Sequence, residues 1–200
     1  MLRVGLTGGL ATGKSHVGMV LSQLGCHLLK ADELGHQVLQ PGGEAYAEVV
    51  RAFGGEILDD AGHIVRRLLA AEVFDDPERL KLLNSIVHPP VIAREEAWFR
   101  EVSAADPGGI AVVEAAILIE TGSYRRFSRL ILTVCEEEQQ IQRAMKRDSL
   151  SREEVVARLR RQMPLEEKRR YADYIIDTSG DKENTARQVR EVYQALQRSI

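Results

Sequence analysis

The sequence predicts an α/β protein with a mostly parallel, five-stranded sheet and helices on both faces of that sheet. Three observations support this fold class. Short apolar segments typical of strands alternate along the chain with longer amphipathic segments typical of helices. The first strand-like segment runs directly into a glycine-rich loop and then into a helix. The segment 110–119 is almost continuously apolar, as expected of a central strand that is covered on both faces.

Five segments have the length and the apolar character of strands. They are residues 2–7, 26–29, 110–119, 129–134 and 174–177. A first helix is expected over 16–24 and a last one over 185–197, because apolar residues recur on one face of each at helical spacing. Together these elements form the expected three-layer αβα core.

The long region between the second and third strands contains no strand signal. Helices are expected there at 44–53, 65–74, 77–87 and 90–102, separated by breaks at 41–43, 54–55, 75–77 and 88–90. This is too much chain for one crossover connection, so we expect a helical insert over about 33–107. The core then comprises about 1–32, 108–135 and 173–200.

The region of about 136–172 is a second helical excursion, and it is dense in charge. Arginines and lysines alternate there with glutamates. One interpretation is a solvated pair of helices held by ion pairs between residues four apart. The other is a mobile lid, whose arginines close over the phosphates during transfer. A lid needs only one or two arginines in the site, so both interpretations stay open.

Composition narrows the possible partners and the location. A net charge of −3 gives no bulk attraction to nucleic acid or to an anionic membrane, so neither is expected as a partner. The two cysteines, Cys26 and Cys135, lie in apolar stretches and are expected to be buried, reduced thiols. No apolar leader precedes the glycine loop, and the longest apolar run is too short to span a bilayer. We therefore expect a cytoplasmic protein.

Residues 8–15 spell G-x-x-x-x-G-K-S between the first strand and the first helix. Glycines let such a loop curl so that successive N–H groups point inward, and the helix N-terminus adds partial positive charge. Lys14 would then reach the outer phosphates, and the Ser15 hydroxyl would ligate a magnesium ion. The loop in this context predicts that the chain binds a nucleoside triphosphate.

Two carboxylates lie near the carboxyl ends of strands, the edge of the sheet where such folds bind their ligands. Asp32 follows the second strand and is a candidate N-cap of a helix beginning at Glu33 and a candidate general base, two roles that are compatible. Glu114 lies in the third strand and is either a partner of the magnesium site or a carboxylate paired at a strand end.

Motifs of other nucleotide-binding classes are missing from the sequence. It contains no N-K-x-D motif and no D-x-x-G after the third strand, which disfavours a signalling GTPase. A small-metabolite kinase fits the length, and the long helical insert favours a bulky acceptor. Two alternatives stay open: a kinase for a nucleotide or a shikimate-like acceptor, and a switch that binds ATP without transferring phosphate.

Several separated segments resemble one family, the dephospho-CoA kinases, along essentially the whole chain. The phosphate loop has that family's form, and the segment 114–122 resembles its D-x-P-L-L-F-E-x-G pattern. Further matching segments are 31–36, 53–58, 62–66, 73–74, 83–89, 139–148, 158–163, 168 and 172–173. The His-Pro of the 83–89 segment, combined with Arg147-Asp148 and Gln162-Met163, makes the resemblance far more specific than the phosphate loop alone.

The resemblance implies transfer of the ATP γ-phosphate to the ribose 3′-hydroxyl of dephospho-CoA, giving CoA and ADP, the last step of CoA biosynthesis. It implies a P-loop kinase core, a coenzyme-binding helical insert, an arginine-bearing lid, and ATP with Mg²⁺. It also implies a role for each site residue. Asp32 would be the base, Lys14 and Arg143 would stabilise the transferring phosphoryl group, and Asp32, Arg66, His88 and Glu114 would contact the substrate. ATP would be bound by Gly8, Gly9, Leu10, Ala11, Thr12, Gly13, Lys14, Ser15, His16 and Arg147.

Departures from the family pattern affect only the details of this assignment. Glu114 replaces the usual Asp, and His16 stands where a threonine is common. Thr178 stands where an asparagine is common, which weakens any assignment of adenine contacts there. For His88, a structural role beside Pro89 competes with substrate contact.

Overall fold

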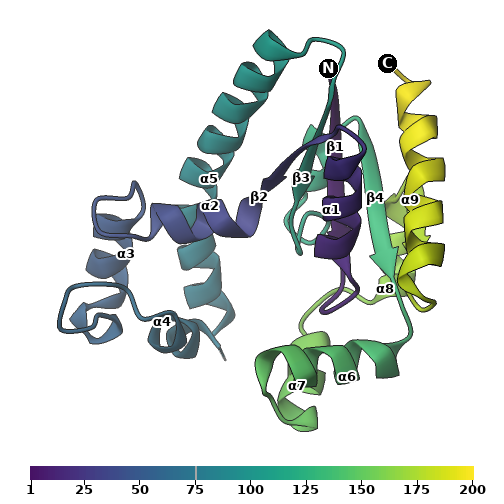
Figure 1. Cartoon of the computed structure of the whole chain (residues 1–200). Helices are drawn as coiled ribbons and strands as arrows, with labels where there is room; N and C mark the ends of the chain where they lie inside the picture. The colour runs from purple at the N-terminus through teal and green to yellow at the C-terminus, as the bar shows by residue number, and fades with distance from the viewer. Residues whose placement is uncertain (75) are drawn as a thin grey trace. The chain divides into compact units, whose positions relative to one another are not determined.

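The computed structural model describes residues 1–74 and 76–200, and its secondary structure is that of an α/β protein (Figure 1). All pairs in its five-stranded sheet are parallel, in the order β2-β3-β1-β4-β5, which confirms the predicted sheet. The strands are β1 (Leu2–Gly8), β2 (His27–Lys30), β3 (Ile110–Glu114), β4 (Arg129–Val134) and β5 (Tyr174–Asp177).

Within the described ranges, helices connect most of the strands, with four in a row between β2 and β3 and three between β4 and β5. They are α1 (Lys14–Gln23), α2 (Ala31–Val38), α3 (Tyr46–Phe53), α4 (Arg66–Val73), α5 (Pro77–Ala105), α6 (Glu137–Asp148), α7 (Arg152–Leu159), α8 (Leu165–Lys168) and α9 (Lys182–Gln197). Short 3₁₀ turns lie at Gly55–Ile57, Ser123–Arg126 and Arg169–Tyr171. The chain divides into two compact units, Met1–Lys30 with Glu101–Ile200, and Ala31–Arg100.

The first unit contains the sheet and buries its core on both faces. Side chains of Val4 and Leu6 lie in one cluster with residues of α1 and α9, the two helices that lie side by side against the sheet in Figure 1. Gly5 faces the opposite way, because side chains alternate along a strand. A Cβ at Gly5 would lie 3.0 Å from Leu118 Cδ1 and 3.1 Å from Phe127 Cδ2. The connection between β3 and β4 therefore covers the second face at this point.

The third strand is shorter than the sequence predicted. β3 ends at Glu114, and of residues 115–119 only Ala115 continues the pairing, through its N–H to Leu6 O at 3.0 Å. The chain then turns, with the Thr121 N–H bonded to Ile117 O. Leu118 and Ile119 are buried within this turn, which explains why the apolar run continues past the end of the strand.

The second unit has its own core, built from α2, α3, α4 and α5. Buried apolar side chains of all four helices form one cluster, among them Val38, Val49, Leu69 and Ile86. The expected break at 88–90 is wrong, because α5 continues through Pro89 and Pro90. A proline removes its own N–H bond but has a φ compatible with a helix. Ile86, Val87 and Val91 pack into the same cluster on both sides of the prolines, so core packing holds the helix together there. Asp75, in the break expected at 75–77, lies outside the described residues.

Both cysteines are buried free thiols, as expected. Burial raises the pKa of the Cys26 thiol to about 12 and also raises the pKa of Cys135. Among the residues that the structure describes, no helix combines the length and the apolar character needed to cross a membrane.

Candidate active site

The loop between β1 and α1 has a backbone that only some residues can adopt. Gly13 has a φ of +83° and Ala11 a φ of +55°, both in the left-handed region. At Gly8 a Cβ would lie 2.1 Å from Thr133 Oγ1, so a larger residue would push the loop away from β4. These positions explain why the glycines of G-x-x-x-x-G-K-S are required.

Three threonine hydroxyls hold this loop from the side of the sheet. The Thr12 hydroxyl donates to Gly9 O at 2.9 Å and lies 2.7 Å from Thr133 Oγ1. The Thr178 hydroxyl donates to Thr12 O, also at 2.9 Å. All three side chains are buried, so their hydrogen bonds are shielded from competing water. The curled loop is therefore supported by β4 and by the segment after β5.

The α1 N-terminus and the Lys14 ammonium both bring positive charge to the same loop. Helix α1 begins at Lys14, directly after Gly13, so its N-terminal N–H groups lie at the loop. The Lys14 ammonium donates to Gly9 O at 3.3 Å and is thereby folded back over the loop. This arrangement suits a bound phosphate chain, because backbone N–H groups, the helix dipole and the ammonium all favour negative charge.

Ser15, in the first turn of α1, forms a pair with Glu114, the last residue of β3. The Ser15 hydroxyl donates to Glu114 Oε1 at 2.7 Å. Glu114 is 6% exposed, and its Oε2 is buried without a hydrogen-bond partner among the described residues. A carboxylate oxygen without a partner in a buried place is costly, which indicates a cation or donor that the free chain does not supply.

The two arginines expected in the lid differ in their contacts. Arg143, on α6, donates to the hydroxyl of Thr178 at 3.1 Å and to its carbonyl oxygen at 2.7 Å, and Thr178 in turn contacts the loop. Arg147 is instead paired with its neighbour Asp148 at 2.7 Å. This pairing lowers the pKa of Asp148 and raises that of Arg147. Arg143 is therefore held near the loop, and Arg147 is held by α6.

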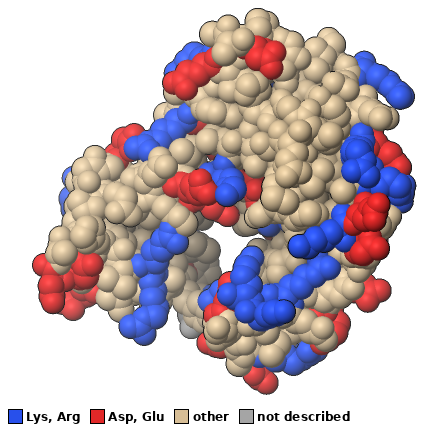
Figure 2. All heavy atoms as spheres, in the orientation of Figure 1, with Lys and Arg blue, Asp and Glu red and all other residues tan. Residues whose placement is uncertain are grey.

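A cavity of about 830 Å³ opens beside the loop within the first unit. Its lining includes Gly9 of the loop, Gln140 of α6, and Asp177 and Ser179 at the end of β5. Hydrogen bonds from the Ser179 side chain and backbone lower the pKa of Asp177. The volume is sufficient for a nucleotide-sized ligand. In Figure 2, basic side chains gather over the α6–α7 region.

The remaining expected site residues belong to the second unit. Asp32 is exposed in the first turn of α2, two residues after the end of β2. The N-cap interpretation is wrong, because α2 begins at Ala31 and Asp32 is already inside the helix. As an acidic residue in the first turn, Asp32 instead interacts favourably with the helix dipole. Arg66 is exposed at the start of α4. His88 lies half-buried in α5, and burial lowers its pKa.

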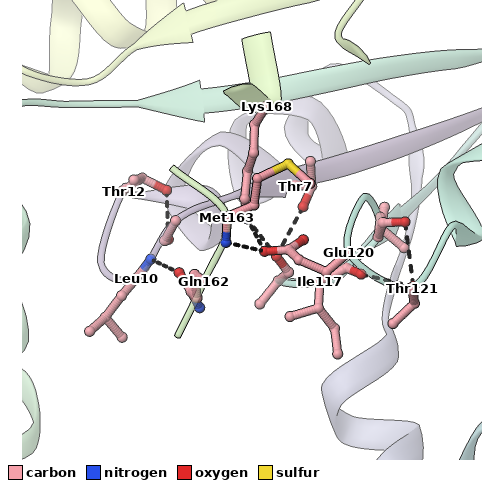
Figure 3. A network of polar contacts seen from close by, with 12 residues as sticks. Thr7, Leu10, Thr12, Ile117, Glu120, Thr121, Gln162, Met163 and Lys168 are labelled. Atoms are coloured by element: carbon pink, nitrogen blue, oxygen red, sulfur yellow. Dashed lines mark hydrogen bonds and ion pairs between the residues drawn. The ribbon is translucent and has the colours of Figure 1, made fainter. Parts of the chain in front are cut away.

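Two residues of the segment after α7 support the site although sequence patterns assigned them no role in it. Gln162 Oε1 accepts the Leu10 N–H of the loop at 2.9 Å. Lys168 is fully buried and pairs with Glu120 at 2.7 Å (Figure 3). Both residues stand in segments that matched the family pattern, but local sequence carries no signal for contacts between segments far apart in the chain.

The chain is similar to known proteins over nearly its whole length. The sequence model of the dephospho-CoA kinase family matches residues 2–184. A dephospho-CoA kinase from Aquifex aeolicus is 40% identical over 198 residues, which cover 99% of each chain.

Two solved structures are similar over nearly the whole chain. A Thermus thermophilus protein has a TM-score of 0.83 at 34% identity, over 98% of this chain and 97% of its own. A dephospho-CoA kinase from Campylobacter jejuni has a TM-score of 0.72 at 26% identity, over 98% of both chains. The sequence, the fold and the phosphate loop lead to the same conclusion: the chain belongs to the dephospho-CoA kinase family and is an ATP-dependent phosphotransferase.

Proposed function

We propose that this chain transfers the γ-phosphoryl group of ATP to the ribose 3′-hydroxyl of dephospho-CoA, giving CoA and ADP. The family match over residues 2–184 supports the acceptor. The observation that carries the transfer chemistry is the supported loop, in which a left-handed Gly13, the α1 N-terminus and the Lys14 ammonium lie together. Such a loop binds a phosphate chain through its backbone N–H groups.

On the ATP side, the residues act by positioning and by charge. Residues 8–16 cradle the phosphates, and Lys14 exchanges its contact with Gly9 O for the outer phosphates. Arg143 is held by Thr178 close to the loop and adds positive charge where negative charge develops during transfer. Arg147 is the second lid arginine in this proposal, and it would have to leave Asp148 to contact ATP.

The oxygen ligands near the loop fit Mg²⁺. Ser15 and Glu114 supply a hydroxyl and a carboxylate, the hard oxygen donors that this ion prefers, and the unpartnered Glu114 Oε2 is free to accept from a water on the ion. The Ser15 oxygen would bind the ion directly. Glu114 would orient the Ser15 hydroxyl by accepting a hydrogen bond from it. The ion would supply charge neutralisation of the phosphates when bound.

The acceptor hydroxyl needs a base, and Asp32 is the candidate. Its side chain is exposed, and it follows β2 by two residues, while the last residue of β2, Lys30, pairs in register with Glu114. In this proposal the Asp32 carboxylate accepts the proton of the 3′-hydroxyl as the oxygen attacks the γ-phosphorus, and ADP leaves on the opposite side. Arg66 and His88, in the second unit, are proposed to contact dephospho-CoA.

The test is ADP release from Mg·ATP with and without dephospho-CoA, with the product identified by mass. Acceptor-dependent release and a mass gain of one phosphate on the coenzyme are expected. ADP release that dephospho-CoA does not stimulate would contradict the acceptor, and nucleotide and shikimate-like acceptors would then be assayed. ATP binding without transfer to any acceptor would instead support a nucleotide-dependent switch. The cytoplasmic location expected from the sequence stays a prediction.

A further inference from the structure

The segment after α7 is anchored by a fully buried lysine. Lys168 has no exposed surface, and its ammonium lies 2.7 Å from Glu120 Oε1 and 3.4 Å from the carbonyl oxygen of Ala116. The Glu120 side chain is itself only 21% exposed. An amine is rarely buried to this extent unless it is paired, because the charged form loses its hydration. The pair therefore joins the 162–168 segment to the connection after β3.

The same carboxylate also fixes the chain five residues before Lys168. Glu120 Oε1 accepts the backbone N–H of Met163 at 3.3 Å. The adjacent residue, Gln162, directs its side-chain oxygen to the Leu10 N–H of the phosphate loop at 2.9 Å. Figure 3 shows these contacts close together, with Lys168 and the backbone nitrogen of Met163 both directed at the Glu120 carboxylate, and Gln162 beside Leu10.

Stability alone does not explain an ion pair at this place. Replacing a buried pair with apolar residues of similar volume is often neutral or stabilising, because two charges no longer lose their hydration. What an apolar pair cannot do is accept the Met163 N–H and thereby set the position of Gln162. The ion pair therefore fixes the position of the backbone at Met163 in addition to filling the interior.

We propose that the Lys168–Glu120 pair is a positioning device for the phosphate loop. Lys168 orients Glu120, Glu120 fixes the backbone at Met163, and this places Gln162 so that its side chain holds the Leu10 end of the loop. Neither Lys168 nor Glu120 touches ATP in this proposal. The kinetic part of the proposal rests on the proposed function, whereas its structural part does not.

The experiment measures hydrogen exchange of the Leu10 amide by NMR, together with KM for ATP and kcat, in Gln162→Ala, Lys168→Met and the variant carrying both. Each single substitution should speed Leu10 exchange and raise KM for ATP by about two- to tenfold, the factor that one intramolecular hydrogen bond typically contributes to an equilibrium, with a smaller change in kcat. Because both act through one contact, the double variant should be no worse than the more severe single variant. Effects that multiply, or an unchanged Leu10 exchange rate in Lys168→Met, would overturn the proposal.

Two further variants separate positioning from folding. Arg187→Met removes an exposed ion pair with Glu191 on α9 and should change neither Leu10 exchange nor KM. If Lys168→Met does not fold, Lys168→Met with Glu120→Leu restores an apolar interior while still lacking the acceptor for Met163. This double variant should fold and exchange Leu10 rapidly; slow exchange in it would overturn the proposal. Leu10 exchange requires no substrate, so the absence of turnover with dephospho-CoA would count against the proposed function and not against this one.

Discussion

The Ser15 hydroxyl donates a 2.7 Å hydrogen bond to the buried carboxylate of Glu114, on the strand next to its own loop. This contact orients the serine oxygen that we propose as a magnesium ligand, and it leaves Glu114 Oε2 available to a water on the ion. The pair also connects the first turn of α1 to the end of β3, two elements far apart in the chain.

Glu114→Gln should weaken the use of magnesium. The amide keeps the size of the side chain but removes its charge. Loss of a residue that orients a metal ligand typically lowers metal affinity by about 10- to 100-fold. We therefore expect the Mg²⁺ concentration needed for half-maximal turnover to rise by about the same factor. The measurement is a Mg²⁺ titration of the initial rate at fixed ATP. Glu191→Gln, an exposed carboxylate on α9, is the matched control. An unchanged titration curve in Glu114→Gln would remove this residue from the metal site.

Lys14→Ala should reduce the rate of phosphoryl transfer by about 100-fold or more. The ammonium donates hydrogen bonds to the phosphate oxygens on which negative charge develops during transfer, and loss of one such donor typically lowers the rate by about this factor. The backbone of the loop should stay intact, since its support comes from Thr12, Thr133 and Thr178. The check is kcat/KM for ATP together with the melting temperature. Lys182→Ala, an exposed lysine at the start of α9, should behave as the unsubstituted chain. A normal rate in Lys14→Ala would contradict its assignment to the phosphates.

Asp32→Asn should retain ATP binding and lose most transfer, by about 100- to 10,000-fold, the range that general base catalysis supplies. ATP affinity is measured by calorimetry and transfer by ADP release. Glu33→Gln provides a neighbouring control, because it removes one carboxylate from the same first turn of α2. If Asp32→Asn turned over like the unsubstituted chain, the base would have to be another residue.

His88 should make stability depend on pH. Burial lowers its pKa from the ordinary value of 6.5, so the folded chain binds fewer protons at this site than the unfolded chain does as the pH falls. This proton uptake by the unfolded chain has no effect on the free energy of unfolding well above pH 6.5, and it lowers that free energy as the pH falls below about 6.5. We expect the melting temperature to fall less between about pH 7.5 and 5.5 in His88→Gln than in the unsubstituted chain. His36, in α2, is exposed, so in the control variant His36→Gln the melting temperature should fall over this pH range as much as in the unsubstituted chain. Equal pH dependence in His88→Gln would show that this histidine does not titrate with folding.

Local features of the fold were predictable because local chemistry determines them. The glycine loop requires its glycines for backbone reasons, and β5 was predicted at its observed bounds, 174–177. Helix boundaries were less accurate: α1 begins at Lys14 and not at His16, because the first helical residues still belong to the phosphate-loop motif and carry no apolar side chain. The bend after Glu114 was missed because buried turn residues and buried strand residues are equally apolar.

Contacts between distant segments were not predictable from patterns. Lys168 is one of many charged residues in 136–172, and no local feature distinguishes it from solvated neighbours such as Glu167. Its burial is decided by the segment around Glu120, far away in the chain. For the same reason the helix break predicted at Pro89 and Pro90 was wrong. The packing that keeps α5 continuous there comes from α2, α3 and α4, which local sequence does not reveal.

The order of strands in the sheet has a consequence for how the chain folds. β1 is the central strand, yet its partners come late in the sequence: Leu2 pairs with Ile110 and Val4 with Arg129. Pairings of such long sequence separation close large loops, which slows folding. During synthesis β1 has no neighbour in the sheet until β3 has left the ribosome, whereas the segment Ala31–Arg100 carries its own core and is complete earlier. The phosphate loop therefore depends for its support on Thr133 of β4 and on Thr178, two residues that are synthesised more than a hundred positions after it.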